Sequence, residues 1–131
     1  MLLPMRVKFI VRVVGFAMAL VGLCAGTAVA APTAMRGVVV DGTTGAGVGG
    51  VTVEALDPVD LTLVAGTDLT SGRGRFRIAG LTSDEYAVYV DGSGAGYESG
   101  YLSCFGEIVP TYGEACTAGP GNVGTIILDP L

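Results

Sequence analysis

The fold class follows from MRGVVVDGTTGAGVGGVTV, residues 35–53. Apolar side chains occupy alternate positions before the glycine-rich segment, as in Met35 and Val39, and again after it, as in Val51 and Val53. A period of two is typical of strands with one buried face, and glycine favours the turn conformations needed between them. We therefore expect two strands joined as the opening hairpin of an antiparallel sheet.

The same alternation recurs further along the chain. Residues 75–78 place Phe76 and Ile78 on one face and two arginines on the other, and residues 86–90 alternate in the same way. Residues 61–65 read as a short edge strand and residues 66–74 as a flexible connection. Short alternating segments separated by glycine-rich turns predict an all-β fold, a single Greek-key β-sandwich of about seven strands. The predicted core comprises Met35, Val39, Val51, Val53, Phe76, Ile78, Tyr86, Val88 and Ile126 or Ile127.

The first 30 residues have the composition of a secretory leader. A basic start is followed by an uncharged apolar run over residues 13–25 and by small residues at Ala28 and Ala30. We predict that residues 1–30 are a cleaved signal peptide and that residues 31–131 form one domain, secreted or held at the cell surface. An uncleaved membrane anchor is the alternative, because no charge occurs between Arg12 and Arg36.

The charge of the exported part excludes some partners. Residues 31–131 carry four arginines, no lysine and all twelve acidic residues, a net charge of −8. Such a chain repels phosphate backbones, so we expect no nucleic-acid partner. Arg73, Arg75 and Arg77 alternate along one segment, which is typical of the wet face of a strand.

A nucleotide-binding pattern occurs in the glycine-rich segment but lacks its context. Residues 45–50, GAGVGG, match G-x-G-x-x-G. That fingerprint requires a helix N-terminus to meet the pyrophosphate, whereas the residues that follow, Val51–Ala55, alternate with a period of two. We therefore expect no nucleotide ligand.

Several strand and turn segments together carry a family resemblance. They are Gly37–Asp41, Thr44–Gly45, Val48–Val53, Gly74–Ile78, Leu81 and Tyr86–Val88. These segments resemble the carboxypeptidase regulatory-like domain over residues 35–90, and more loosely to Leu128. The resemblance implies a prealbumin-like, immunoglobulin-like sandwich with a carbohydrate-binding-like fold, and an adhesive, scaffolding or accessory role.

Catalysis is disfavoured by the residue types that are present. The chain has no histidine, which removes the commonest general base, the commonest zinc ligand and the usual Ser-His and Cys-His arrangements. Acidic residues lie among turn residues, where solvated side chains are the ordinary role. We predict no enzymatic activity, no cofactor and no metal, with calcium held by the loop aspartates as the weaker alternative.

The cysteines and tyrosines of the last third supply the candidate site residues. Once Cys24 leaves with the leader, Cys104 and Cys116 are the two remaining cysteines of an exported chain, so we predict that they form a disulfide. Tyrosines on loops at one end of a sandwich suit sugar faces or protein anchors. We predict ligand binding by Tyr97, Tyr101 and Tyr112; the alternative is that the first two pack beneath the cysteine loop.

Two functions of different classes fit these observations. The first is a secreted non-catalytic binding module that engages carbohydrate, or another envelope or extracellular protein, through its loops. The second is a purely structural exported domain, or a subunit of a surface assembly, that has no small ligand. In either case we expect contact with a membrane only through the leader during export.

Overall fold

The computed structural model describes residues 33–131. The predicted signal peptide, residues 1–30, lies outside the described residues. Within the described part the helical structure consists of two short 3-10 turns, η1 (Ser93–Ala95) and η2 (Tyr112–Glu114). No helix in this part of the chain has the length and apolar character that crossing a membrane requires.

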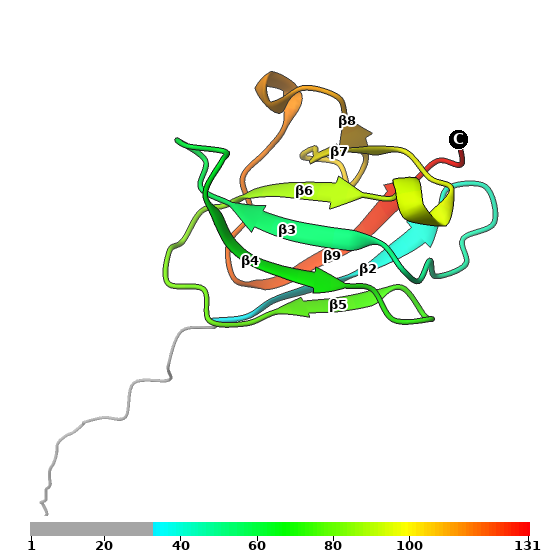
Figure 1. Cartoon of the computed structure of the whole chain (residues 1–131), viewed down its shortest axis with the longest axis horizontal. Coiled ribbons are helices and arrows are strands. Elements are labelled where there is room, and N and C mark those ends of the chain that lie inside the picture. The colour runs from blue at the N-terminus through cyan, green and yellow to red at the C-terminus, as the bar shows by residue number, and fades with distance from the viewer. Residues whose placement is uncertain (1–32) are drawn as a thin grey trace, which may run out of the picture. The chain divides into compact units, whose positions relative to one another are not determined.

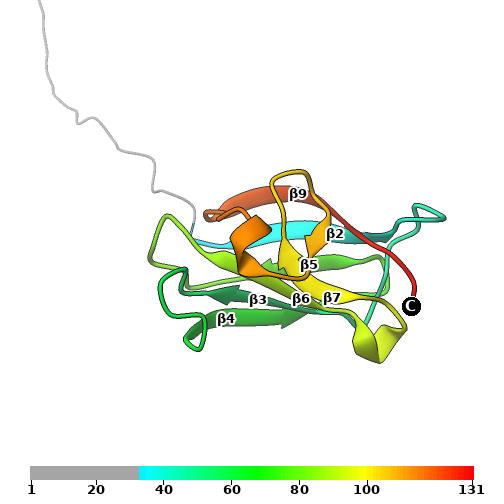
Figure 2. The ribbon, with the colours of Figure 1, turned by 90° about the horizontal axis from the view of Figure 1, so that it is seen from above.

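The strands form two sheets packed face to face, so the predicted all-β sandwich is confirmed (Figures 1 and 2). The chain passes repeatedly between the sheets, as in a Greek-key sandwich, and the described residues contain eight strands instead of about seven. The three-stranded sheet has the order β5 (Arg75–Ile78), β2 (Met35–Asp41), β9 (Gly121–Leu128). The five-stranded sheet has the order β4 (Val64–Leu69), β3 (Thr52–Leu56), β6 (Ala87–Asp91), β7 (Ser99–Leu102), β8 (Ile108–Val109).

The predicted opening hairpin is wrong, because β2 and β3 belong to different sheets. β2 pairs antiparallel with β5 and parallel with β9, whereas β3 pairs with β4 and β6. The glycine-rich segment between β2 and β3 therefore crosses from one sheet to the other. The buried hydroxyl of Thr70 anchors it, donating to the carbonyl of Val48 at 2.7 Å and accepting from the N–H of Val51 at 2.9 Å.

The predicted core is confirmed at every position. The inward residues of both sheets are buried and pack into one cluster. At the C-terminal end the buried isoleucine is Ile126, whereas Ile127 is half-buried on the outer face. The strands thus keep the inward parity that their alternation predicts.

The edge strand β4 lies further along the chain than predicted. It begins at Val64 instead of residue 61 and continues to Leu69, through residues predicted to form a flexible connection. Its position at the edge of the five-stranded sheet is confirmed. Every residue of β4 is at least partly exposed, so its sequence shows no inward apolar alternation.

Gly74 is a position where the fold requires glycine. Its φ is +80°, and a Cβ there would collide with the carbonyl oxygen of Val39 on β2.

Replacing Gly74 by alanine should lower the free energy of unfolding by about 2 to 3 kcal/mol, measured by chemical denaturation. Gly72 is the matched control, because a Cβ there meets nothing within 4 Å. Gly72→Ala should change stability by less than about 0.5 kcal/mol. Equal effects of the two replacements would contradict this account.

Candidate functional site

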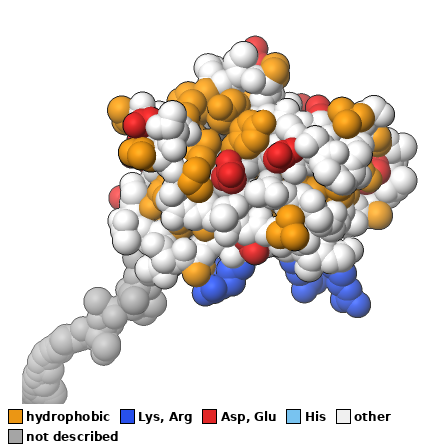
Figure 3. Space-filling model, viewed as in Figure 1, with side chains coloured by type: hydrophobic (Ala, Val, Ile, Leu, Met, Phe, Trp, Pro, Cys, Tyr) orange, Lys and Arg blue, Asp and Glu red, His pale blue; other side chains and the backbone are white. Residues whose placement is uncertain are grey.

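The outer face of the five-stranded sheet carries a row of tyrosine rings. Tyr89 on β6 lies opposite Tyr101 on β7, with ring centroids 5.1 Å apart. Tyr112 in η2 packs edge-on against Tyr101 at 5.8 Å. All three side chains are half-buried, so part of each ring remains accessible. These three residues are termed the tyrosine face. Figure 3 shows hydrophobic side chains, a class that includes tyrosine, gathered on the side of the molecule toward the viewer, with acidic side chains beside them.

Two carboxylates flank the tyrosine face. Glu54 on β3 lies opposite Tyr89, and Asp91 follows Tyr89 by two residues on the same face of β6. The Asp91 carboxylate accepts hydrogen bonds from Ser93 Oγ at 2.7 Å and Ser99 Oγ at 2.9 Å, and these hold the pKa of Asp91 below its usual value. Burial, and then the negative charge of Asp91, raises the pKa of Tyr89. At neutral pH the Asp91 carboxylate is therefore an ionised acceptor beside the protonated phenol of Tyr89.

The disulfide between Cys104 and Cys116 is confirmed, and it closes the loop that carries Tyr112. The two Cα atoms are 5.0 Å apart, and β8 and η2 lie between them. The N–H of Cys116 donates to the carbonyl of Leu102, at the end of β7, at 3.1 Å. Because Leu102 is the neighbour of Tyr101, the cross-linked end of the loop is fixed next to the strand on which the tyrosine row is built.

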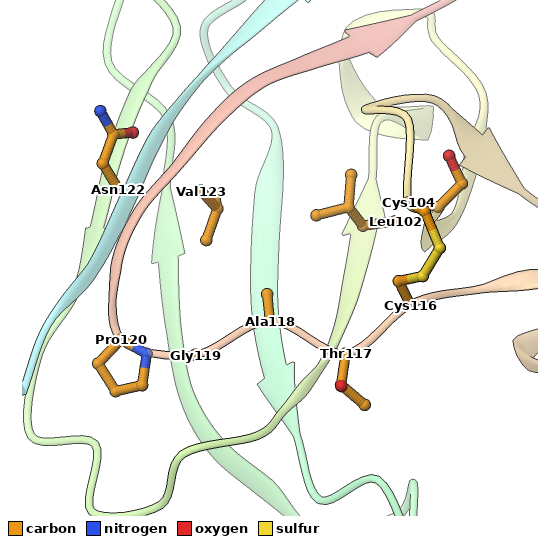
Figure 4. A pocket seen from close by; sticks show the side chains of 10 residues that line it. Leu102, Cys104, Cys116, Thr117, Ala118, Gly119, Pro120, Asn122 and Val123 are labelled. Atoms are coloured by element: carbon orange, nitrogen blue, oxygen red, sulfur yellow. A yellow bond between two sulfur atoms is a disulfide. The ribbon is translucent and has the colours of Figure 1, made fainter.

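A hollow of about 450 Å³ opens beside the disulfide. In Figure 4 the side chains of Leu102, Ala118 and Val123 border the same space, and Leu102 lies on the side of the two sulfur atoms. None of the residues that line the hollow has an ionisable side chain. The hollow has room for a neutral ligand group, and it offers no acid or base for proton transfer at that place.

Tyr97 lies apart from this face. Its hydroxyl donates to Asp41 Oδ2 at 2.6 Å, and its ring packs against the core. The Asp41 carboxylate also accepts from the N–H groups of Thr43 and Thr44. The phenol and these two N–H groups lower the pKa of Asp41. Tyr97 thereby connects the β6–β7 segment of one sheet to the end of β2 in the other.

The structure thus brings together two of the three predicted tyrosines and adds one. Tyr101 and Tyr112 are neighbours, whereas Tyr97 is engaged at the end of the sandwich. Tyr89 was not among the predicted site residues. A signal for it existed, because the inward parity of Val88 and Val90 leaves Tyr89 as a large aromatic side chain on the outer face of a strand.

The acidic loop residues act locally. Within residues 33–131 no three histidine, cysteine, aspartate or glutamate side chains are grouped closely enough to hold a metal ion. Asp57 Oδ1 instead accepts from the N–H groups of Val59 and Asp60, and Asp60 Oδ1 accepts from Thr62. These are side-chain bonds that shape turns.

No protein-family model matches the chain, and no curated protein matches it significantly.

Removing the disulfide should loosen the loop between Cys104 and Cys116, which carries Tyr112, and should destabilise the domain. Replacing both Cys104 and Cys116 by serine should lower the free energy of unfolding by about 3 kcal/mol, because the unfolded chain gains the entropy of the opened loop. The denatured secreted protein, which lacks the predicted leader and its Cys24, should show no free thiol and a monomeric mass. Two free thiols per chain would refute the bridge.

The Asp41–Tyr97 contact should make stability depend on pH in the acid range. Because folding lowers the pKa of Asp41 below its usual value of 3.8, the folded state holds its proton less tightly than the unfolded state. The stabilisation that the Asp41 contacts provide is therefore complete above pH 3.8, and it is lost as the pH falls through the lower pKa of the folded state. Tyr97→Phe should raise the pKa of Asp41, measured by carboxyl NMR titration, and flatten the acid dependence of the melting temperature. An unchanged titration would contradict the role of the phenol.

Proposed function

We propose that this protein is a secreted non-catalytic module that binds carbohydrate through the tyrosine face. The observation that carries the proposal is the contiguous row of three part-exposed rings beside Glu54 and Asp91. A phenol ring offers flat apolar area with a polar tip, which suits the alternating C–H and O–H groups of a sugar. Carboxylate oxygens at the edge can accept hydrogen bonds from sugar hydroxyls.

Export is supported by two independent features. The disulfide is typical of proteins outside the cytoplasm. The order of basic, apolar and small residues in residues 1–30 is that of a signal peptide. The β-sandwich is also the architecture that resemblance to the carboxypeptidase regulatory-like domain implies, so we propose membership of that family, with a binding or accessory role.

A protein partner is the second candidate, favoured by the edge of the five-stranded sheet. Three apolar side chains in or beside the edge strand β4 are exposed. Their exposed fractions are 55% for Leu63, 51% for Val64 and 60% for Leu69. An exposed apolar edge strand can accept a strand from another chain. This surface suits a subunit of a surface assembly more than it suits a small ligand.

The carbohydrate proposal is tested by truncating the tyrosine face. The secreted protein should bind a defined set of glycans on an array, and titration calorimetry should then give the affinity for the best neutral glycan. Tyr101→Ala and Tyr112→Ala should each weaken that affinity at least about tenfold, equivalent to about 1.4 kcal/mol, because each removes a stacking ring. Two separate variants are needed because Tyr101 also packs within the sheet.

Phe105→Ala is the matched control. Phe105 lies in the same disulfide loop and is 86% exposed, but it is not part of the tyrosine row. This variant, and Glu107→Gln on the same loop, should retain the affinity within about threefold. If Phe105→Ala abolished glycan binding while Tyr101→Ala and Tyr112→Ala retained it, the proposed binding role of the tyrosine face would be refuted. The protein-partner function would be favoured if the protein bound no glycan and instead captured a protein partner that the Val64→Lys variant no longer captured.

A further inference from the structure

All four arginines of the described residues gather on one part of the surface. Arg36 on β2 and Arg75 and Arg77 on β5 alternate with inward residues, so they project from the outer face of the three-stranded sheet. Arg73 lies in the turn directly before β5, and all four are exposed. Figure 3 shows the basic side chains grouped on the β5 side of the molecule. This group is termed the arginine face.

The arrangement is unfavourable for the isolated domain. Arg36 lies directly opposite Arg77 across the β2–β5 pair, and like charges in that position repel. The outer-face neighbours of these arginines are uncharged: Asn122 is in register with Arg36, and Thr125 with Val38. The nearby Asp68 of β4 accepts a hydrogen bond from the backbone N–H of Arg77 at 2.7 Å. An anionic partner would relieve the repulsion between the guanidinium groups.

A hollow between two of the arginines has room for one anionic group. It has a volume of about 190 Å³ and is bordered by Arg36, Arg75, Val38 and Asn122. Two guanidinium forks can bind a carboxylate through paired N–H···O bonds. The amide of Asn122 can bond a hydroxyl, and Val38 offers an apolar contact.

We propose that the arginine face binds a linear carboxylated polysaccharide. The mixture of guanidinium, amide, hydroxyl and apolar groups on one flat face matches an acidic sugar, which presents carboxylate, hydroxyls and C–H groups together. The site is separate from the tyrosine face, because the two lie on the outer faces of different sheets. The domain would thereby hold two carbohydrate ligands on opposite sides.

Charge density favours this ligand over a phosphate polymer. The arginines are spaced about 5 Å apart across strands and about 7 Å apart along β5, as side chains on a sheet are. A carboxylated polysaccharide carries no more than one carboxylate per sugar ring, with neutral ring atoms and hydroxyls between successive charges, so it can contact Asn122 and Val38 as well as the arginines. A densely charged phosphate chain would extend beyond four arginines and meet the acidic remainder of a domain with a net charge of −8.

The test uses polygalacturonate as the probe and dextran as the neutral comparison, at low ionic strength, with the secreted protein. We expect binding to polygalacturonate that weakens as salt is added, and no binding to dextran at the arginine face. Arg36→Gln/Arg75→Gln should weaken binding to polygalacturonate at least about tenfold, because it removes both forks of the hollow. Binding of a neutral glycan at the tyrosine face should be unchanged in this variant.

A charge-matched control separates a local site from net charge. Thr111→Glu/Thr117→Glu changes the net charge by the same amount at two exposed positions outside the three-stranded sheet. This variant should keep its affinity for polygalacturonate within about threefold. Equal weakening in both double variants would show a net-charge effect and overturn the proposal. Tighter binding to polyphosphate than to polygalacturonate, or no binding to polygalacturonate by the unaltered protein, would also overturn it.

Thermal unfolding distinguishes a binding role from a structural one. Because Arg36 and Arg77 repel each other, Arg36→Gln/Arg75→Gln should leave the melting temperature unchanged or raise it. A large fall in melting temperature would show that the arginines support the sheet. In that case the loss of binding is tested again with Arg73→Gln, in the turn, which should weaken binding by a smaller factor without affecting the strands.

Discussion

The parallel pairing of β2 with β9 is the constraint on which the other features depend. It joins the first and last described strands over seven register positions, from Met35↔Gly121 to Asp41↔Leu128. Without β9 the first sheet would be a two-stranded ribbon, which is marginal by itself in water. Closing so long a stretch of chain carries a conformational-entropy cost that the burial of Ile126 and Leu128 must offset. The disulfide loop ends just before β9, so this pairing also determines where that loop returns to the sandwich.

The sequence predicts what faces inward better than it predicts what pairs with what. Alternation identifies the buried side of each strand, and the predicted core is buried throughout. Two strands bury alternate side chains in the same way whether they pair as a hairpin or face each other in two sheets. The pattern of residues 35–53 therefore could not reveal that β2 and β3 lie in different sheets. The parallel partner of β2 is equally hidden, because pairing between distant segments leaves no local pattern. β4 was misplaced because an exposed edge strand has no buried face to impose alternation.

Part of the candidate site can also be predicted from the sequence, whereas the rest depends on how the strands pair. The cysteine pair was predictable because only two cysteines lie beyond the predicted leader. The loop tyrosines were predicted as one group, but only register and ring geometry separate Tyr101 and Tyr112 from Tyr97, which bonds Asp41 in the other sheet. Tyr89 joins the site because β6 and β7 pair in a register that places it opposite Tyr101. That register depends on tertiary packing, and no spacing within either segment encodes it.

The division of chemistry between the two outer faces has a physical basis. In a sandwich the inward positions are fixed by packing, whereas the outward positions of each sheet vary with little effect on the fold. One sheet presents tyrosines and carboxylates outward, and the other presents Arg36, Arg75 and Arg77, with Arg73 in the turn directly before β5. Because the rest of the domain is acidic, an anion approaching from most directions is repelled, and attraction is confined to the arginine face. The charge asymmetry therefore orients an anionic ligand before contact, which a uniformly mixed surface of the same net charge would not do.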